Sequence, residues 1–309
     1  MSKSSVKHPH FSQIKIYRLQ DIYPEIEDQL LKAHFIPPES GQWSRSGFIP
    51  VNSEILGNRY QVTIDKISYM RLQTEQKILT EAMIKDLIVE NLISRSSIND
   101  LGSKTDTYAS LDKWEKDYLR DQVIIQHLPD AFSETFITEG VMDVQSKLLF
   151  VNTANASRAD TFVNSLRNAV SDLGEFHAFR PTTVVPLHEF MRDVVLNGQS
   201  EDEKFEVGFS CVICEDSKNG QVIRISNGDV GSGQVLQHLN ARMKVTQLNM
   251  IWKDLVEFTL TEDFDLKSIK FRDNPGKDVS WDSVLYDRSI FLSSLINDIV
   301  ALSGGWKQL

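Results

Sequence analysis

The 309-residue chain is poor in cysteine and contains only Cys211 and Cys214. Two thiols are too few for a disulfide framework in a chain of this length, which is typical of proteins from a reducing compartment. Long hydrophobic runs are missing too. No segment approaches the roughly 20 apolar residues that cross a bilayer, and the N-terminus lacks the apolar segment of a secretory signal. We therefore expect a cytoplasmic protein without a membrane partner.

The common motifs of catalysis and nucleotide binding are also missing, including GxSxG, the Walker A loop and GxGxxG. The seven histidines have no paired, metal-binding spacing. In a strand, Cys211 and Cys214 point to opposite faces and cannot chelate one metal together. Gly228, Gly231 and Gly233 lack the Lys-Ser/Thr of a phosphate-binding loop, so we expect a flexible turn there. We interpret the protein as a non-enzyme without a cofactor.

Net positive charge is absent as well, because the formal net charge is −10. Such an acidic balance argues against a protein that coats nucleic acid over its whole surface. Any DNA binding must come from a local patch. The N-terminal residues 1–10 form a basic segment that includes Lys3 and Lys7, and we expect a disordered tail there in preference to a DNA-contacting arm.

Hydrophobic periodicity changes repeatedly between strand and helix patterns, which predicts a mixed α+β fold. Alternation around Ile14 and Ile16 indicates the first strand. We divide the remainder of the chain into an N-terminal α+β region at 11–75, a helical tip at 76–128, a central β-β-α region at 129–198, and a C-terminal β-rich region with a terminal helix at 199–309.

The segment from Leu111 to Phe136 is the most distinctive. Apolar residues recur there at helical spacing, with charged residues between them, at Leu111, Trp114, Tyr118, Ile125 and Leu128. The helix must stop near His127 and Leu128, because Pro129 disfavours a helical conformation of the residue before it. A corner that carries Phe132 follows.

Several short segments occur in a characteristic order. Leu128-Pro129 and Ala131-Phe132-Ser133 lie between the helix and a predicted hairpin, and the other segments are Tyr17-Arg18-Leu19, Glu75-Gln76-Lys77-Ile78-Leu79, Val184-Val185-Pro186-Leu187, Leu248 to Trp252, and Asp265 to Phe271. In their order and spacing they resemble the RdgC family, the recombination-associated proteins of bacteria. The resemblance extends over roughly Phe11 to Gly305.

This resemblance implies an elongated fold with antiparallel sheets and a projecting helical tip. It implies a head-to-head homodimer shaped as a closed ring, whose positively lined hole admits double-stranded DNA without reading its sequence. Such a protein limits the access of RecA to DNA and associates with the nucleoid. An acidic exterior is compatible with this function if a few cations are gathered inside the hole.

The candidate DNA-binding residues follow from the resemblance and from charge. They are Lys77, Arg120, Phe132, Arg71, Lys116 and Arg224. From the sequence alone, a Phe at a helix-to-strand corner is expected in the core. The resemblance implies instead that Phe132 lies in the region facing the DNA hole, where it stacks on bases or anchors a dimer contact.

The sequence departs from the family at positions where positive charge is common, namely at Asp130, at Glu134 and in Ser226-Asn227-Gly228. Each lost phosphate contact lowers the slope of log affinity against log salt by about 0.9. A second hypothesis is therefore an RdgC-fold protein that has lost DNA binding and acts as a protein-interaction or DNA-mimic module.

Overall fold

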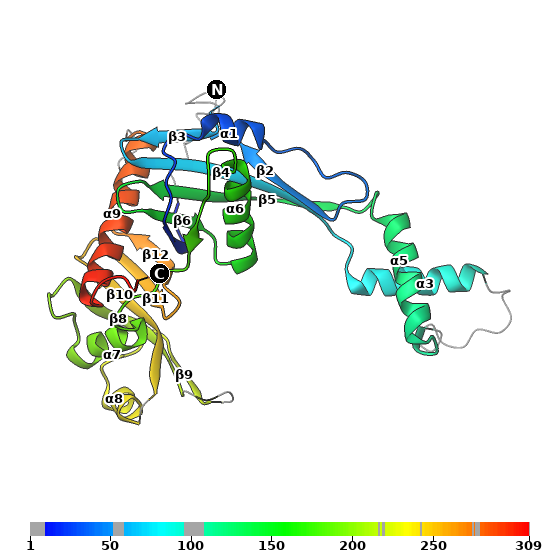
Figure 1. Ribbon diagram of the computed structural model, residues 1–309. Coiled ribbons are helices and arrows are strands. Elements are labelled where there is room, and N and C mark those ends of the chain that lie inside the picture. The colour runs from blue at the N-terminus through cyan, green and yellow to red at the C-terminus, as the bar shows by residue number, and fades with distance from the viewer. Residues whose placement is uncertain are drawn as a thin grey trace, which may run out of the picture. The chain divides into compact units, whose positions relative to one another are not determined.

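The computed structural model describes residues 10–51, 59–95, 108–215, 217, 220–241, 243–273, 275 and 279–308 (Figure 1). Its strands are β1 (Ile14–Leu19), β2 (Ser44–Ile49), β3 (Gln61–Ile64), β4 (Ile67–Lys77), β5 (Ser133–Asp143), β6 (Leu148–Asn152), β7 (Ala178–Phe179), β8 (Phe205–Cys214), β9 (Val222–Ile225), β10 (Lys244–Trp252), β11 (Val256–Thr261) and β12 (Asp265–Phe271). Its helices are α1 (Glu27–Lys32), α3 (Glu81–Arg95), α5 (Lys113–His127), α6 (Ala156–Ala169), α7 (Leu187–Asn197), α8 (Gly233–Asn240) and α9 (Trp281–Leu302).

The chain divides into two compact units. Unit 1 comprises Met1–Lys32, Pro50–Arg71 and Thr138–Leu309, and unit 2 comprises Ala33–Ile49 and Leu72–Ile137. Strand β4 leads from unit 1 into unit 2, and strand β5 leads back. Unit 2 is therefore built from two separate stretches of the chain.

Unit 1 is organised around an antiparallel sheet with the strand order β5-β6-β1-β12-β11-β10-β8-β9. The first strand lies in the middle of this order. On one side Ile16 pairs with Phe150 of β6, and on the other Ile14 pairs with Leu266 of β12. Strand β1 thus forms its hydrogen bonds with segments that follow much later in the sequence.

The side chains of β1 alternate between the two faces of this sheet. Ile14 and Ile16 are buried in the large hydrophobic core that also contains the buried residues of α7 and α9. On the opposite face, the Tyr17 hydroxyl lies 3.3 Å from a carboxylate oxygen of Asp160 on α6. Helices therefore cover both faces of the sheet around β1, which places this strand in the interior of unit 1.

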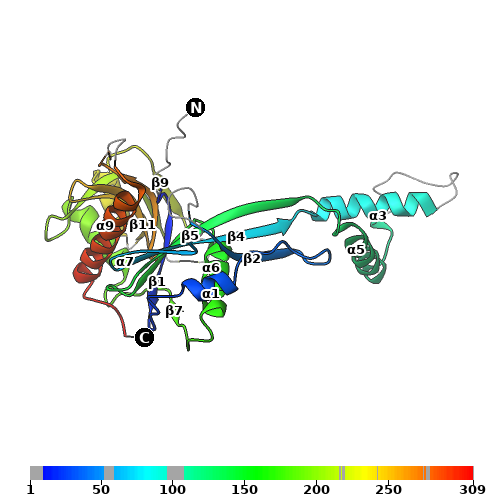
Figure 2. The ribbon, with the colours of Figure 1, turned by 90° about the horizontal axis from the view of Figure 1, so that it is seen from above.

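Unit 2 combines strand ends with a pair of helices (Figure 2). The Ser46 hydroxyl of β2 lies 2.8 Å from the Thr74 hydroxyl of β4, and the Lys77 backbone N–H donates to the Trp43 carbonyl at 2.7 Å. Helices α3 and α5 pack through a small core of their own, in which Ile84, Ile88 and Val123 are buried.

These observations confirm the mixed α+β class and the antiparallel sheets. Residues 96–107 of the predicted helical tip lie outside the described residues, and so does the basic tail apart from His10. The turn expected at Gly228, Gly231 and Gly233 is confirmed at the first two, which lie in a bend and a turn, and is wrong at Gly233, where α8 begins. No helix within the described ranges has the length and hydropathy needed to span a membrane.

Candidate nucleic-acid interface

The corner between α5 and β5 brings Lys77 and Phe132 together. The Lys77 ammonium donates hydrogen bonds to the carbonyls of Pro129 at 2.8 Å and Ala131 at 3.4 Å. One residue further, the Ile78 backbone N–H donates to the Phe132 carbonyl at 2.7 Å. The end of β4 and the corner are therefore fixed to each other at two successive residues.

The Phe132 side chain projects from this corner with 84% of its surface exposed. The expectation of a core residue is wrong, because the hydrogen bond from Ile78 holds the Phe132 backbone and leaves the ring in solvent. Asp130 and Glu134 on either side of it are also exposed. An exposed phenyl ring therefore lies between two exposed acidic residues in the sequence, at the position where the resemblance placed a functional aromatic residue.

Helix α5 begins with a capping box. The Asp112 carboxylate accepts from the Glu115 backbone N–H at 2.8 Å, and the Glu115 carboxylate accepts from the Asp112 backbone N–H at 2.9 Å. This reciprocal pair satisfies backbone donors that have no partner inside the helix. The helix ends at His127, which confirms the boundary predicted from Pro129.

The outer face of α5 is unusually apolar. Val123 and Leu128 are buried and Leu111 is half-buried, but three apolar residues of the pattern are exposed, with exposed fractions of 72% at Trp114, 51% at Tyr118 and 71% at Ile125. The Trp114 and Tyr118 rings stack, with centroids 5.6 Å apart and planes inclined by 10°. The sequence pattern therefore identified the helix correctly but combined residues from its buried and exposed sides.

Two of the candidate cations lie on α5. The Arg120 guanidinium forms an ion pair with Glu81 on α3, with Nη2 2.6 Å from Oε1. The hydrogen bond with Glu81 raises the Arg120 pKa, and the same hydrogen bond lowers the Glu81 pKa. Lys116 lies one helical turn before Arg120, and its ammonium is 5.4 Å from the centroid of the Tyr108 ring. Both cations are positioned by neighbours in unit 2.

The remaining two candidates belong to unit 1. Arg71 on β4 is half-buried, and its Nε atom is buried without a hydrogen-bond partner among the described residues. Arg224 is exposed on β9 and pairs through its backbone with Val212 of β8. The structure thus places Lys77, Phe132, Lys116 and Arg120 in one unit and the other two candidates in the other.

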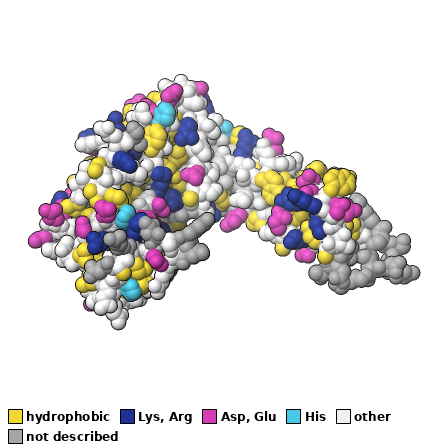
Figure 3. All heavy atoms as spheres, turned by 60° about the horizontal axis from the view of Figure 1, so that its bottom comes forward, with side chains coloured by type: hydrophobic (Ala, Val, Ile, Leu, Met, Phe, Trp, Pro, Cys, Tyr) yellow, Lys and Arg dark blue, Asp and Glu magenta, His cyan; other side chains and the backbone are white. Residues whose placement is uncertain are grey.

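Charge on the surface is mixed. On the face shown in Figure 3, Lys and Arg side chains are interspersed with Asp and Glu side chains on both units. Unit 2 contains more carboxylates than Lys and Arg side chains. Cations in unit 2 can therefore attract a phosphate backbone only over short distances, because neighbouring carboxylates oppose them at longer range.

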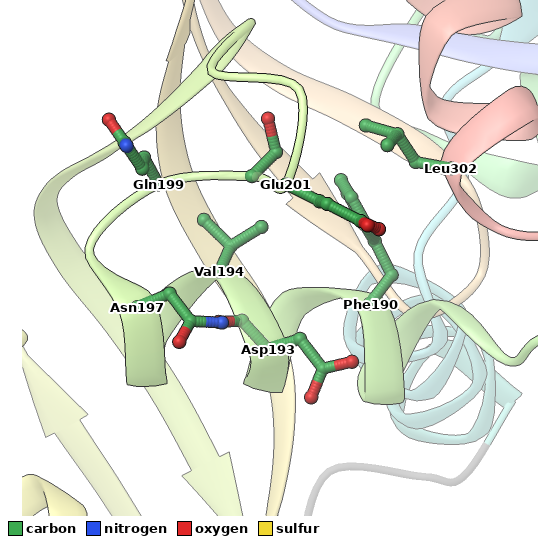
Figure 4. Close-up of a pocket in the computed structure, with 8 residues that line it drawn as sticks. Phe190, Asp193, Val194, Asn197, Gln199, Glu201 and Leu302 are labelled. Carbon is green, nitrogen blue, oxygen red and sulfur yellow. The ribbon is translucent and has the colours of Figure 1, made fainter.

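Unit 1 contains a cavity of about 430 Å³ between α7 and the segment that leads into β8 (Figure 4). Phe190, Val194 and Leu302 supply apolar walls, and the polar lining includes the carboxylates of Asp193 and Glu201. Among the described residues, no Lys or Arg lines this cavity. Two carboxylates repel an anionic group, so a phosphate is not a suitable ligand for it.

The cysteine motif contains one buried thiol and one half-buried thiol. Both cysteines lie in β8 as predicted, with Cys211 buried and Cys214 half-buried. Burial raises the pKa of the Cys211 thiol to about 11, which disfavours the nucleophilic thiolate. Within the part of the chain that the structure describes, no three His, Cys, Asp or Glu side chains are grouped so that they could hold a metal ion.

Two features of this surface were missed by reasoning from the sequence. The exposed Trp114–Tyr118 stack had a signal, since two aromatic residues four positions apart share one face of a helix. The ion pair between Arg120 and Glu81 had no signal in the sequence, because 39 residues separate the partners. Only the packing of α3 against α5 brings these two residues together.

The family model and the similar curated proteins point to the same family. The family model described as "RdgC: Putative exonuclease, RdgC" matches residues 10–283. Similar curated proteins carry the name "Recombination-associated protein RdgC". The one from Neisseria meningitidis serogroup C is 28% identical over 316 aligned residues, which cover 96% of this chain and 99% of that protein. The one from Psychromonas ingrahamii is 26% identical, with coverage of 97% and 95%.

Proposed function

This chain belongs to the RdgC family, and from that premise we propose that it binds double-stranded DNA without reading its sequence and acts in recombination. The observation that carries the proposal is the match over nearly the whole chain to relatives named as recombination-associated proteins. The exposed Phe132 and the cations Lys116 and Arg120 of the same unit support it.

The proposed binding mode is a ring-shaped homodimer that encircles the duplex. Exposed apolar side chains in unit 2 support self-association, because large apolar groups that remain in water are stabilised when a partner covers them. These side chains are Trp114, Tyr118, Ile125 and Phe132. A closed ring retains DNA topologically and needs few attractive contacts, which suits a chain with a net charge of −10.

Phosphate neutralisation supplies the affinity in this proposal. Its candidate contributors are Lys116 and Arg120 of unit 2 and Arg71 and Arg224 of unit 1. Lys77 is hydrogen-bonded to the corner of unit 2 that carries Phe132. Contacts to phosphate carry no sequence information, so binding is indifferent to base order. A protein that occupies duplex DNA in this way limits the access of RecA and associates with the nucleoid.

We propose a binding function without catalysis. The family description contains the word exonuclease, but metal-dependent hydrolysis of phosphodiesters needs convergent metal ligands. No such group occurs among the described residues. A nuclease assay with end-labelled duplex and Mg²⁺ or Mn²⁺ tests this part of the proposal. Shortened products that persist through rigorous purification of the protein would contradict it.

A second candidate is a protein-interaction module with a DNA-like surface. It is favoured by the exposed acidic residues Asp130 and Glu134, two positions before and after the exposed Phe132, because carboxylates repel an acidic partner such as DNA. An apolar residue framed by carboxylates instead suits a basic protein surface.

Fluorescence anisotropy separates the two candidates. Short duplexes of random sequence are titrated with the protein at low and at moderate salt. Binding that is indifferent to sequence and weakens as salt increases supports the DNA function, because counterion release makes phosphate contacts salt-dependent. No binding at low salt contradicts that function and favours the module.

A further inference from the structure

Lys77 was expected to contact DNA phosphate, but its ammonium is directed at the protein backbone. It donates at 2.8 Å to the Pro129 carbonyl and at 3.4 Å to the Ala131 carbonyl. Two of its three N–H donors are therefore used within unit 2. Both acceptors lie just beyond the C-terminus of α5, where the helix dipole also favours a cation.

The backbone around Lys77 reinforces the same contact. The Lys77 N–H donates to the Trp43 carbonyl at 2.7 Å, and the next N–H, that of Ile78, donates to the Phe132 carbonyl at 2.7 Å. The Ser133 hydroxyl donates to the Glu75 carboxylate at 2.6 Å. The end of β4 thus holds the corner on both sides of Phe132.

The Phe132 ring cannot be positioned by core packing, because 84% of its surface is exposed. Its direction depends on the backbone of residues 129–133. Pro129 lacks a backbone N–H, so this corner has one donor fewer for hydrogen bonds within the turn. The Lys77 ammonium supplies hydrogen bonds from outside the turn.

We propose that Lys77 is a positioning residue that holds the α5–β5 corner so that Phe132 projects from the surface, and that it is not a phosphate contact. The proposal rests on the proposed DNA-binding function, in which Phe132 contacts DNA or completes the ring that encloses it. In this role Lys77 acts through Phe132, so the two residues form one functional unit.

Equilibrium DNA binding distinguishes a positioning residue from a phosphate contact. The variants are Lys77→Met, Phe132→Ala, their double variant, and Lys113→Met as the control, since Lys113 is an exposed lysine at the start of α5. We expect Lys77→Met to weaken binding about tenfold, as Phe132→Ala does, and the double variant to bind no more weakly than either single one.

The salt dependence provides the decisive readout. A phosphate contact at Lys77 would lower the slope of log affinity against log salt by about 0.9 in Lys77→Met. We expect the slope of Lys77→Met to equal that of the wild type. A reduced slope, or additive effects in the double variant, would overturn the positioning role.

Hydrogen exchange measured by mass spectrometry on the free protein tests the corner directly. Exchange at Ile78 and in residues 130–133 should accelerate about tenfold in Lys77→Met, because a charge-assisted hydrogen bond is lost, and should be unchanged in Lys113→Met. Unchanged exchange in Lys77→Met would overturn the inference. Wild-type protein that fails to bind DNA would contradict the proposed function instead, and exchange would still decide the role of Lys77 in the corner.

Discussion

At the scale of single residues, the Arg120 guanidinium already binds a carboxylate of the protein, and a DNA phosphate would have to compete for the same N–H donors. It donates two hydrogen bonds to the Glu81 carboxylate, through Nη2 at 2.6 Å and Nε at 3.4 Å. The hydrogen bond with Arg120 lowers the Glu81 pKa, so this carboxylate stays ionised at neutral pH. It therefore competes with DNA for the same donors.

We predict that Glu81→Gln strengthens DNA binding and steepens the salt dependence by up to about 0.9, because Arg120 becomes available to phosphate. The thermal unfolding midpoint should hardly change, since exposed ion pairs contribute little to stability. Anisotropy titrations at several salt concentrations and a thermal melt measure both. Glu90→Gln is the control, because Glu90 is an exposed carboxylate on the same helix. Equal effects of both variants would mean that only net charge matters.

Single positions also show where sequence reasoning stops. Pro129 correctly predicted the end of α5, because proline restricts the backbone locally. The exposure of Phe132 was not predictable in the same way, since the side of a corner that faces water depends on what packs against its backbone. Here the contacts come from Lys77 and Ile78, more than 50 positions earlier in the chain.

At the scale of elements, the packing of α6 on β5 depends on the absence of a side chain at Gly140. A Cβ atom built at Gly140 would overlap the ring of Phe162, which is fully buried in α6. The helix can approach the strand this closely only because glycine leaves room for the ring.

We predict that Gly140→Ala lowers the free energy of unfolding by about 1–3 kcal/mol through overpacking. Phe162→Leu introduced into Gly140→Ala should recover part of this loss, because the smaller side chain makes room for the methyl group. Urea unfolding followed by circular dichroism measures the change. Gly233→Ala is the control, since a Cβ there meets no atom within 4 Å. A Gly140→Ala protein as stable as the wild type would contradict the close packing.

A charge network ties α9 to two loops of unit 1. The Asp298 carboxylate lies 2.8 Å from the Lys204 ammonium and 2.9 Å from the Lys253 ammonium, and it accepts from the Trp252 indole N–H at 2.9 Å. Burial alone would raise the Asp298 pKa, but the hydrogen bonds from these three donors outweigh it and lower the pKa. The ionised carboxylate therefore stabilises the folded state.

We predict that Asp298→Asn lowers the free energy of unfolding by about 1 kcal/mol at neutral pH. Because the folded-state pKa lies below the ordinary value of 3.8, this difference is fully present above that pH. It should shrink as the pH falls through the folded-state pKa, where the wild type also loses the charge. Urea unfolding at a series of pH values measures the gap. Asp287→Asn, at an exposed position on α9, serves as the control and should show no such gap.

The elements that the sequence predicted best have a strong period. The alternation around Ile14 and Ile16 marked β1. The terminal helix expected in the region 199–309 is α9, in which Leu295 and Ile299 are buried one turn apart. Helix α8 was missed because its first residue, Gly233, belongs to a glycine-rich run that is typical of turns. The apolar pattern of α5 combined residues of its buried and exposed sides for another reason. Apolar spacing predicts a helix but does not show which face of that helix packs against a partner.

At the scale of the whole molecule, we predict that the protein is a dimer held together by unit 2. Trp114→Ser combined with Ile125→Ser should shift sedimentation toward the monomer, because exposed apolar anchors are lost from the proposed interface. Val222→Ser is the control, since Val222 is an exposed apolar residue in unit 1. A monomeric wild type at micromolar concentration would contradict the ring.

The division into units was only partly accessible from the sequence. Local patterns indicate helices and strands, but not that residues 33–49 join residues 72–137 in one compact body. That grouping depends on contacts such as the one between Ser46 and Thr74. Long-range pairing has no local signature, so the sheet order of unit 1 was equally hidden.

The central place of β1 has a consequence for biosynthesis. The strand leaves the ribosome long before its neighbour β12, as the Lys15–Asp265 ion pair spans 250 positions. During translation the backbone N–H and C=O groups along this edge of β1 have no partner strand until β12 has been made. They are exposed to water or bound by a chaperone in the meantime. A truncated product that ends before β12 therefore exposes an unfinished β edge, and such edges promote aggregation.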